Sequence, residues 1–269
     1  MGLIFGQETS ELYESWYQSP HGRAVDQSIE RLLRSQIRPK SGDRVLDVGC
    51  GTGHHILNLA RLGLDASGVD ASPYVIRRAR ERLGPGVELL TGYAEDLPFD
   101  DNAFDVVVLI NTLEFLDNPL AALREAGRVA HRRVFVGVLN SLSWVGLIKR
   151  IQGYMGDPVF RRAKFYHLWQ IKSLMQAAFG DVPISWGCIN IGPAFFGRSE
   201  SQGDQSPFGS FLGVSATMTY RLRTENVPLT VRIKNGQRSL VSVRTAGEIN
   251  RKTGDWVDER SLPLQPPGG

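Results

Sequence analysis

The sequence predicts an α/β fold with a Rossmann-like, doubly wound sheet of seven strands, mostly parallel with an antiparallel last strand, and helices on both faces. Three observations predict it. Short apolar runs alternate with amphipathic helical patterns between residues 44 and 139. Residues 106–110 read VVVLI without polar alternation, which is typical of a parallel strand buried on both faces. A glycine-rich turn follows the first run and opens a helix, as in sheets that bind ligands at the carboxyl ends of their strands.

The N-terminal region is expected to form a helical cap on this sheet. Apolar residues between 23 and 37 repeat with helical spacing, and Pro39 ends that pattern. The expected organisation is a cap at residues 1–41, a main domain at 42–223 with a substrate lid at about 141–168, and a partly disordered C-terminal extension at 224–269.

The elements of the main domain follow from the pattern in order. Strands are predicted at residues 44–48, 66–69, 87–90, 105–110 and 134–139. Helices are predicted at residues 54–62, 74–83 and 120–129. After Asn140 the pattern loosens, and the predicted elements are a helix at 169–179 and strands at 184–188 and 212–222. Weak β character continues beyond residue 224, and the end, LPLQPPGG, has the composition of a disordered tail.

The composition is that of an ordinary globular protein and argues against several classes. The 31 basic and 28 acidic residues leave a net charge of +3, which is small for a nucleic-acid-binding surface. Cys50 and Cys188 do not make a disulfide framework. The run at residues 106–110 is the longest apolar one and is too short for a membrane span, and the acidic N-terminus does not resemble a secretory signal. We therefore expect a cytoplasmic protein with no nucleic-acid partner and no membrane span.

The strongest motif is the strand and glycine loop VLDVGCGTG at residues 45–53. Glycine adopts positive φ and lets a ligand approach the backbone closely. Dinucleotide-binding loops usually have the spacing Gly-x-Gly-x-x-Gly, which seats a pyrophosphate at the helix N-terminus. Here the spacing is Gly-x-Gly-x-Gly, and the bulky His54 and His55 open the helix. The motif therefore favours a ligand without a pyrophosphate, and a purely structural turn is the alternative.

Two further motifs lie in register with this loop. Asp70 follows Gly53 by 17 residues and ends the second predicted strand, where a carboxylate can accept hydrogen bonds from both hydroxyls of a ribose. The alternative is an aspartate that caps the next helix. The sequence GYAEDLPF at residues 92–99 follows the third strand and can present a backbone N–H and a carboxylate to an adenine edge. The alternative for this segment is a surface turn.

These motifs, with FDVVV at residues 104–108, closely resemble the UbiE-like branch (methyltransferase type 11) of the class I S-adenosylmethionine-dependent methyltransferases, over roughly residues 42–140. The resemblance implies S-adenosyl-L-methionine as the cofactor. It places the methionine moiety at the glycine loop, the ribose at Asp70 and the sulfonium near Asn111. The cofactor-binding residues that it implies are Asp47, Gly49, Cys50, Gly51, Gly53, Asp70, Ala71, Ala94, Glu95, Asn111 and Tyr17.

The acceptor side of the site is less well marked. After the fourth strand the chain reads NTLEF at residues 111–115, where the family often has a histidine-rich stretch, so the catalytic residues remain unknown. Aromatic residues near the N-terminus, including Tyr13, resemble the family's cap segment, and the region 141–168 lies where the family places a lid. The candidate substrate residues are Trp16, Glu114, Trp144, Tyr166 and His167. For the aromatic ones, packing in a core is the alternative.

The sequence therefore predicts an S-adenosylmethionine-dependent methyltransferase that acts on a small-molecule acceptor. A nicotinamide-dependent oxidoreductase is one alternative, because it can share the strand-glycine-helix start. A non-catalytic cofactor-binding scaffold is the other, because the sequence has no obvious base and a long C-terminal extension. No metal is expected, since the adjacent His54 and His55 point in different directions on a helix and no ligand cluster has metal-binding spacing. A general base is needed only if the acceptor must lose a proton, and Glu114, Tyr166 and His167 are the candidates. The acceptor and the oligomeric state stay open.

Overall fold

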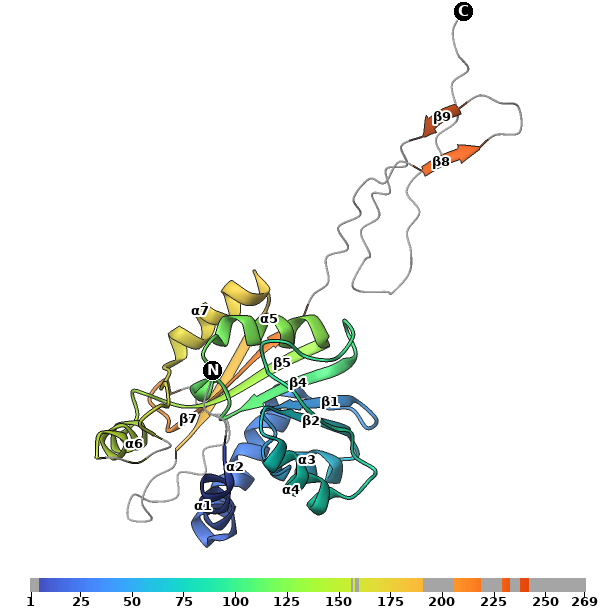
Figure 1. Cartoon of the computed structure of the whole chain (residues 1–269). Coiled ribbons are helices and arrows are strands. Elements are labelled where there is room, and N and C mark those ends of the chain that lie inside the picture. Colours follow the sequence, from blue (N-terminus) through green and yellow to red (C-terminus); the bar gives the residue numbers. More distant parts are fainter. Residues whose placement is uncertain are drawn as a thin grey trace, which may run out of the picture. The chain divides into compact units, whose positions relative to one another are not determined.

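The computed structural model describes residues 5–155, 157, 160–190, 206–218, 229–232 and 238–241. It contains a seven-stranded sheet in the order β3-β2-β1-β4-β5-β7-β6 (Figure 1). The strands are β1 (Arg44–Val48), β2 (Asp65–Asp70), β3 (Leu89–Thr91), β4 (Phe104–Ile110), β5 (Ala130–Leu139), β6 (Ile184–Ile189) and β7 (Phe211–Thr217). The pairs among β1 to β5 are parallel, and β7 is antiparallel to both of its neighbours. The predicted mixed sheet with an antiparallel last strand is thereby confirmed.

Helices cover both faces of the sheet, as predicted. They are α1 (Gln7–Gln18), α2 (Pro20–Ile37), α3 (His54–Arg61), α4 (Pro73–Leu83), α5 (Pro119–Val129), α6 (Trp144–Tyr154) and α7 (Leu168–Phe179), with a 3₁₀ turn, η1 (Leu113–Phe115). The helices α5 and α7 pack on one face, and α2, α3 and α4 pack on the other (Figure 1). Among the described residues, no helix combines the length and the apolar character that a membrane crossing needs.

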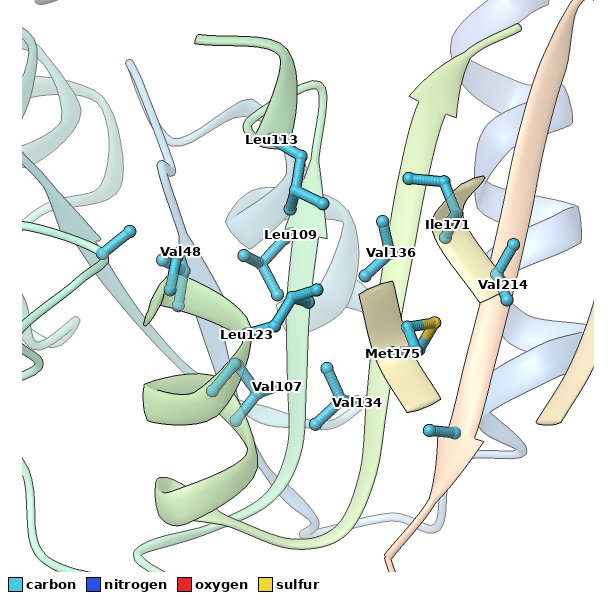
Figure 2. Close-up of a cluster of buried hydrophobic side chains, with 14 of the residues drawn as sticks. Val48, Val107, Leu109, Leu113, Leu123, Val134, Val136, Ile171, Met175 and Val214 are labelled. Atoms are coloured by element: carbon cyan, nitrogen blue, oxygen red, sulfur yellow. The ribbon is translucent and has the colours of Figure 1, made fainter. Parts of the chain in front are cut away.

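Strand β4 explains why its sequence lacks alternation. Val107 and Leu109 pack toward Leu123 of α5 and the helix α7 (Figure 2). The intervening side chains, such as Val108, pack on the opposite face with α2 and α3. Because successive side chains of a strand point to opposite faces, a strand covered on both sides needs apolar residues at every position. All five residues of VVVLI are buried.

Several boundaries differ from the predictions for identifiable reasons. The fifth strand begins at Ala130 and not at residue 134, because Ala130 pairs with Phe104 ahead of a register shift in β4. Helix α2 begins at Pro20, three residues before the predicted start. There, Ser19 caps the helix by accepting a hydrogen bond from Gly22 N, and proline suits the first helical position.

The C-terminal region forms a separate unit, residues 220–269. Its described part is an antiparallel pair, β8 (Leu229–Arg232) and β9 (Arg238–Val241), in the stretch where the sequence has weak β character. The predicted disorder at the end of the 224–269 extension lies outside the described residues, as do positions 219–222 of the predicted last strand.

Strand order places a switch point between β1 and β4. From β1 the chain continues to β2 and β3 on one side, whereas β4 and β5 lie on the other. In open α/β sheets, ligands bind beyond the carboxyl ends of the strands at such a point. The segments that follow β1 and β4 are the glycine loop and residues 111–115. The predicted cofactor loop and the predicted acceptor residue Glu114 therefore lie at the same switch point.

Candidate cofactor and acceptor sites

The glycine loop has the backbone that its spacing predicts. Gly49, Gly51 and Gly53 all have positive φ, at 76°, 52° and 77°. A Cβ on Gly49 would lie 2.5 Å from the side chain of Thr112, so this glycine is required by the approach of the segment after β4. A Cβ on Gly51 would meet nothing within 4 Å. The loop thus leaves open space above Gly51, as a cradle for a ligand requires.

Asp70 ties the glycine loop to the end of β2. Its Oδ2 accepts a hydrogen bond from Gly51 N at 3.0 Å, and its Oδ1 accepts one from Ser72 N at 2.8 Å. Burial raises the pKa of this carboxyl group, while the two backbone hydrogen bonds oppose the rise. Because each carboxylate oxygen has a further lone pair, Asp70 can bond the loop and still accept from a ribose diol.

Asp47 is a buried carboxylate whose negative charge is not fully balanced by hydrogen bonds. It is 1% exposed, and its Oδ2 has no hydrogen-bond partner in the described structure. Burial and the nearby Asp70 raise its pKa to about 7. A buried, unpaired carboxylate is costly, and a cationic ligand group beside the glycine loop would offset that cost. The cationic methionine end of S-adenosylmethionine therefore fits the donor set of this loop.

Asn111 occupies the left-handed region at the end of β4, with φ of 52°. Asparagine is one of the few residues with a side chain that tolerate this conformation. Its Nδ2 donates to Tyr13 Oη at 3.2 Å, and its buried Oδ1 has no partner in the described part of the chain. Burial, followed by the charge of Glu114, raises the pKa of Tyr13 to about 12, so its hydroxyl stays protonated.

Helix α1 and the two residues before it, Phe5 and Gly6, close over the strand ends. The carbonyl of Phe5 accepts a hydrogen bond from Ser72 Oγ at 2.7 Å, next to Asp70 and Ala71. Glu14 pairs with Arg82 of α4 at 2.9 Å. The Tyr17 ring stacks on His54 with a centroid separation of 4.0 Å. The cap segment therefore contacts the glycine-loop helix α3, the ribose-side loop and the end of β4.

The adjacent histidines serve this packing. His54 Nε2 lies 2.9 Å from Asp26 Oδ2 of α2, and Asn58 Nδ2 donates to the same oxygen at 3.0 Å. Burial lowers the pKa of His55 to about 4, so this ring is neutral near pH 7. Within the described residues, no group of three or more histidine, cysteine or carboxylate side chains has metal-binding geometry.

The adenine-side predictions fall into a compact turn. Ala94 is buried and Glu95 is half-buried, in the turn that the Tyr93–Asp96 bridge closes after β3. Cys50 is buried within the glycine loop, and a Cβ on Gly68 would lie 2.8 Å from its sulfur. Burial, with Asp47 and Asp70 adding to it, raises the pKa of the Cys50 thiol. Cys50 thus packs beneath the loop with its thiol protonated.

A cavity of about 530 Å³ lies beside Asn111 and Glu114. It is formed between α1, the segment after β4, helix α6 and described residues between 157 and 165. The apolar side chains that line it include Leu12, Trp16, Phe115, Trp144, Ile148 and Phe165. Its polar groups include Tyr13, His21, Asn111, Glu114, Lys149 and Asp157. The predominance of aromatic and aliphatic walls suits a small, largely apolar ligand.

Glu114 supplies a carboxylate to this cavity. The side chain is 2% exposed, and its Oε1 accepts a hydrogen bond from Leu139 N at 2.9 Å. Its Oε2 is buried without a partner in the described structure. Burial raises the pKa of Glu114 to about 7, so both protonation states are populated near neutral pH. A group with that pKa can accept and release a proton at physiological pH.

The structure brings together three of the five candidate substrate residues. Trp16, Glu114 and Trp144 line the cavity with Asn111. Tyr166 is buried in the core, where its hydroxyl donates to Leu113 O at 3.4 Å. His167 caps α7: its Nδ1 accepts from Gln170 N, while Gln170 Oε1 accepts from His167 N.

These positions show what sequence reasoning missed. Tyr166 and His167 do not line the cavity, and the spacing His167-x-x-Gln170 before an apolar run could have indicated the capping role. Lys149 and Phe160 line the cavity without having been singled out. No local pattern marks them, because they reach the cavity only through the fold of residues 141–168.

The sheet order defines a Rossmann-like fold, and the glycine loop and the carboxylate at the end of β2 lie at the strand edge where such folds bind ligands. A family described as the methyltransferase domain matches residues 46–136. An uncharacterised methyltransferase of Mycobacterium tuberculosis is 36% identical over 164 residues, which are 59% of this chain and 63% of that protein. The 2-methyl-6-phytyl-1,4-hydroquinone methyltransferase 1 of Oryza sativa is 29% identical over 164 residues, 58% of this chain and 45% of that protein.

Solved structures agree on the fold. An S-adenosylmethionine-dependent methyltransferase of Thermotoga maritima, described as a possible histamine N-methyltransferase, superposes with a TM-score of 0.61 at 24% identity, over 78% of this chain and 95% of that one. The chain therefore resembles S-adenosylmethionine-dependent methyltransferases in sequence over residues 46–136 and in its fold. It spans less than two thirds of the length of the Mycobacterium relative. Nothing in these similarities favours the oxidoreductase or the scaffold alternative.

Proposed function

We propose that this protein transfers the methyl group of S-adenosylmethionine to a small, largely apolar phenol or hydroquinone. One observation carries the choice of acceptor. The Glu114 carboxylate has an oxygen without a hydrogen-bond partner, and it lies at the wall of an otherwise apolar cavity next to Asn111. A ring with one ionisable hydroxyl would match both the walls and the carboxylate. The hydroquinone methyltransferase of rice is a relative that supports this acceptor class.

The cofactor side of the proposal rests on the loop after β1. Gly51 offers open space, Asp70 offers carboxylate lone pairs to a ribose, and Asp47 offers a buried negative charge to the methionine end. When bound, S-adenosylmethionine supplies a methyl group that is already activated on a sulfonium. The protein's main task is then to hold the acceptor in line with that methyl group.

Orientation of the acceptor is assigned to the walls of the cavity. Trp16 and Trp144 come from α1 and α6, and Phe115 comes from η1, so three separate elements hold an aromatic ring. The acceptor hydroxyl is directed to the polar edge formed by Asn111 and Glu114.

Glu114 is assigned as the general base. The acceptor hydroxyl gives its proton to Glu114 Oε2, and the oxygen becomes a better nucleophile as that proton leaves. The raised pKa of about 7 makes the carboxylate a stronger base than an ordinary glutamate. The proton then returns to solvent when the product leaves. The same proton transfer serves methylation at oxygen. For methylation at a ring carbon conjugated to it, the hydrogen on that carbon must in addition leave to solvent as a proton, which restores the aromatic ring.

The proposal is tested with purified full-length protein. Calorimetry with S-adenosylhomocysteine measures cofactor binding, and the absence of binding at millimolar ligand would overturn the methyltransferase assignment. Transfer of a labelled methyl group is then compared among alkyl-substituted phenols, hydroquinones and amines of similar size. We expect the hydroxylated rings to be preferred by at least tenfold. A preference for amines would leave the enzyme class intact and overturn the acceptor class.

Glu114→Gln separates the base from the binding site. We expect kcat to fall by roughly 10²-fold or more, the scale of a lost general base, while S-adenosylhomocysteine still binds. Asp100→Asn, at an exposed turn, is the matched control and should leave kcat unchanged. An unaltered kcat in Glu114→Gln would remove Glu114 from the reaction.

A further inference from the structure

Helix α6 packs on the protein through the side of the helix that carries its glycines. A Cβ on Gly146 would lie 2.0 Å from the carbonyl oxygen of Asn140. A Cβ on Gly153 would lie 2.7 Å from the backbone of Phe160. Since both contacts are with backbone atoms, this side of α6 has no room for large side chains. The bulky residues of the helix must therefore point elsewhere.

The opposite side of α6 is an exposed apolar stripe, defined here as Trp144, Leu147, Ile148, Ile151, Tyr154 and Met155. These side chains are between 38% and 87% exposed. Their spacing of three, four and seven residues places them on one face of the helix. An amphipathic helix usually buries such a stripe against a core, and large exposed apolar patches mark interaction sites.

The surroundings of the stripe are positively charged. Residues 141–170 contain five lysine or arginine residues and one acidic residue, Asp157. Arg150, Arg161 and Arg162 are exposed. Helix α1, in contrast, has glutamates and no basic residue. Basic residues therefore outnumber acidic ones around the stripe, and this charge would attract an anionic partner and repel a second copy of the same face.

The apolar stripe is continuous with the acceptor cavity. Trp144 and Ile148 belong to the stripe and also line the cavity. Leu12 and Trp16 of α1 line the same cavity and are exposed as well. An apolar molecule held at the stripe could pass into the cavity along these side chains.

We propose that α6 is a membrane-surface helix that docks this protein on an anionic bilayer. The apolar stripe enters the interfacial region, and the arginines contact the lipid headgroups. Tryptophan and tyrosine are favoured at that depth because they have an apolar ring and a polar edge. The docking itself is independent of the proposed reaction. The consequence that an apolar acceptor enters the cavity from the bilayer rests on the proposed function.

Vesicle flotation with the full chain tests the docking, without cofactor or acceptor. We expect binding to vesicles of equal parts phosphatidylcholine and phosphatidylglycerol. Binding should be at least tenfold weaker to phosphatidylcholine alone, and weaker in 0.5 M than in 0.1 M salt. Equal binding to both vesicle types, or to neither, would overturn the proposal.

Two variants that change the net charge by the same amount at different places test where the docking surface lies. Leu147→Glu with Ile151→Glu changes the net charge by −2 on the stripe, at positions that do not line the cavity. Arg77→Glu changes it by −2 on the exposed surface of α4. We expect the first variant to lose at least tenfold in vesicle binding and the second to retain most of it. Equal losses would show that only net charge matters.

Two further measurements keep the outcomes distinct. Circular dichroism and S-adenosylhomocysteine binding check that the double variant is folded, and both should match the wild type. Size-exclusion chromatography checks self-association. If the wild type is a stable dimer that does not bind vesicles, and the double variant is a monomer, then α6 is a dimer interface and the membrane proposal is wrong. Because no turnover is measured, failure of the proposed reaction leaves these results unaffected.

Discussion

Asn111 donates a hydrogen bond from its Nδ2 to the hydroxyl of Tyr13 at 3.2 Å, and so joins the end of β4 to helix α1 across 98 residues of sequence. Both side chains line the acceptor cavity. The contact therefore couples the position of the N-terminal helix to the strand end where the two halves of the site meet.

Tyr13→Phe tests this coupling. The change leaves the ring in place and removes one hydrogen bond from a buried amide, so we expect the free energy of unfolding to fall by about 1 kcal/mol. Urea denaturation measures the loss. Tyr74→Phe on α4 is the control, because that ring contacts Arg77 far from the cavity, and it should cost less than 0.5 kcal/mol. If the two variants lose the same free energy of unfolding, the contact between Tyr13 and Asn111 does not stabilise the fold.

The carboxylate at the end of β2 predicts a change in cofactor affinity. Asp70→Ala should weaken S-adenosylhomocysteine binding by about 1–3 kcal/mol, since hydrogen bonds to a charged group are lost. Calorimetry gives the difference. Asp65→Ala, at the exposed start of the same strand, should bind like the wild type. Thermal unfolding separates a loss of affinity from a loss of fold, because Asp70 also holds Gly51 N.

Gly49 and Gly51 should respond differently to alanine. Gly51→Ala places a methyl group in open space, so the cost to the fold is the left-handed backbone, about 1–2 kcal/mol. The same methyl group enters the space expected for the cofactor, so binding of S-adenosylhomocysteine should be lost. Gly49→Ala adds a collision with Thr112 and should lower the melting temperature much further.

The control for this pair is Gly42→Ala, at an exposed turn with φ of 82° and open space around the Cβ. It carries the same kind of backbone strain and should leave binding intact. If Gly51→Ala binds as tightly as Gly42→Ala, the space above Gly51 is not used by the ligand.

Glu114 predicts how stability changes with pH. Burial raises its pKa from 4.5 to about 7 in the folded chain. As pH rises from 4.5 to 7, the unfolded chain releases the proton and the folded chain keeps it, so this group's contribution to stability is lost. Glu114→Gln cannot ionise and avoids the loss. We therefore compare the free energy of unfolding of the variant with that of the wild type at each pH. Above pH 7 this difference should favour the variant by about 3 kcal/mol more than it does at pH 4.

Thermal unfolding at pH 4, 6 and 8 measures this difference. Asp47, whose pKa is raised in the same direction, is present in both proteins and cancels in the comparison. A difference that does not change with pH would mean that Glu114 has the same pKa in the folded chain as in the unfolded chain.

Much of the fold could be predicted because its signals are local. The sequence VVVLI has no polar alternation, and β4 is buried on both faces. The alternate glycines predict positive φ, and all three have it. The start of β5 could not be placed, because Ala130 joins the strand through a tertiary pairing with Phe104.

The acceptor side was harder to predict, because its residues meet only through tertiary structure. Glu114 was one candidate base among three. The structure shows that Leu139 N donates to one of its carboxylate oxygens and that the other oxygen is buried without a partner in the described residues, which the sequence does not indicate. Tyr166 and His167 have the right chemistry, but they serve the core and the α7 cap. The apolar residues of α6 have helical spacing in the sequence, which alone does not say whether that face is covered.

The burial of both cysteines has a practical consequence. Cys50 and Cys188 lie in the interior, and the thiol of Cys50 is held protonated, so neither should react readily with maleimides in the folded protein. Tyr154→Cys would therefore give one accessible attachment point for a polarity-sensitive fluorophore on α6. Its emission would report contact with lipid directly, against little background from the native thiols.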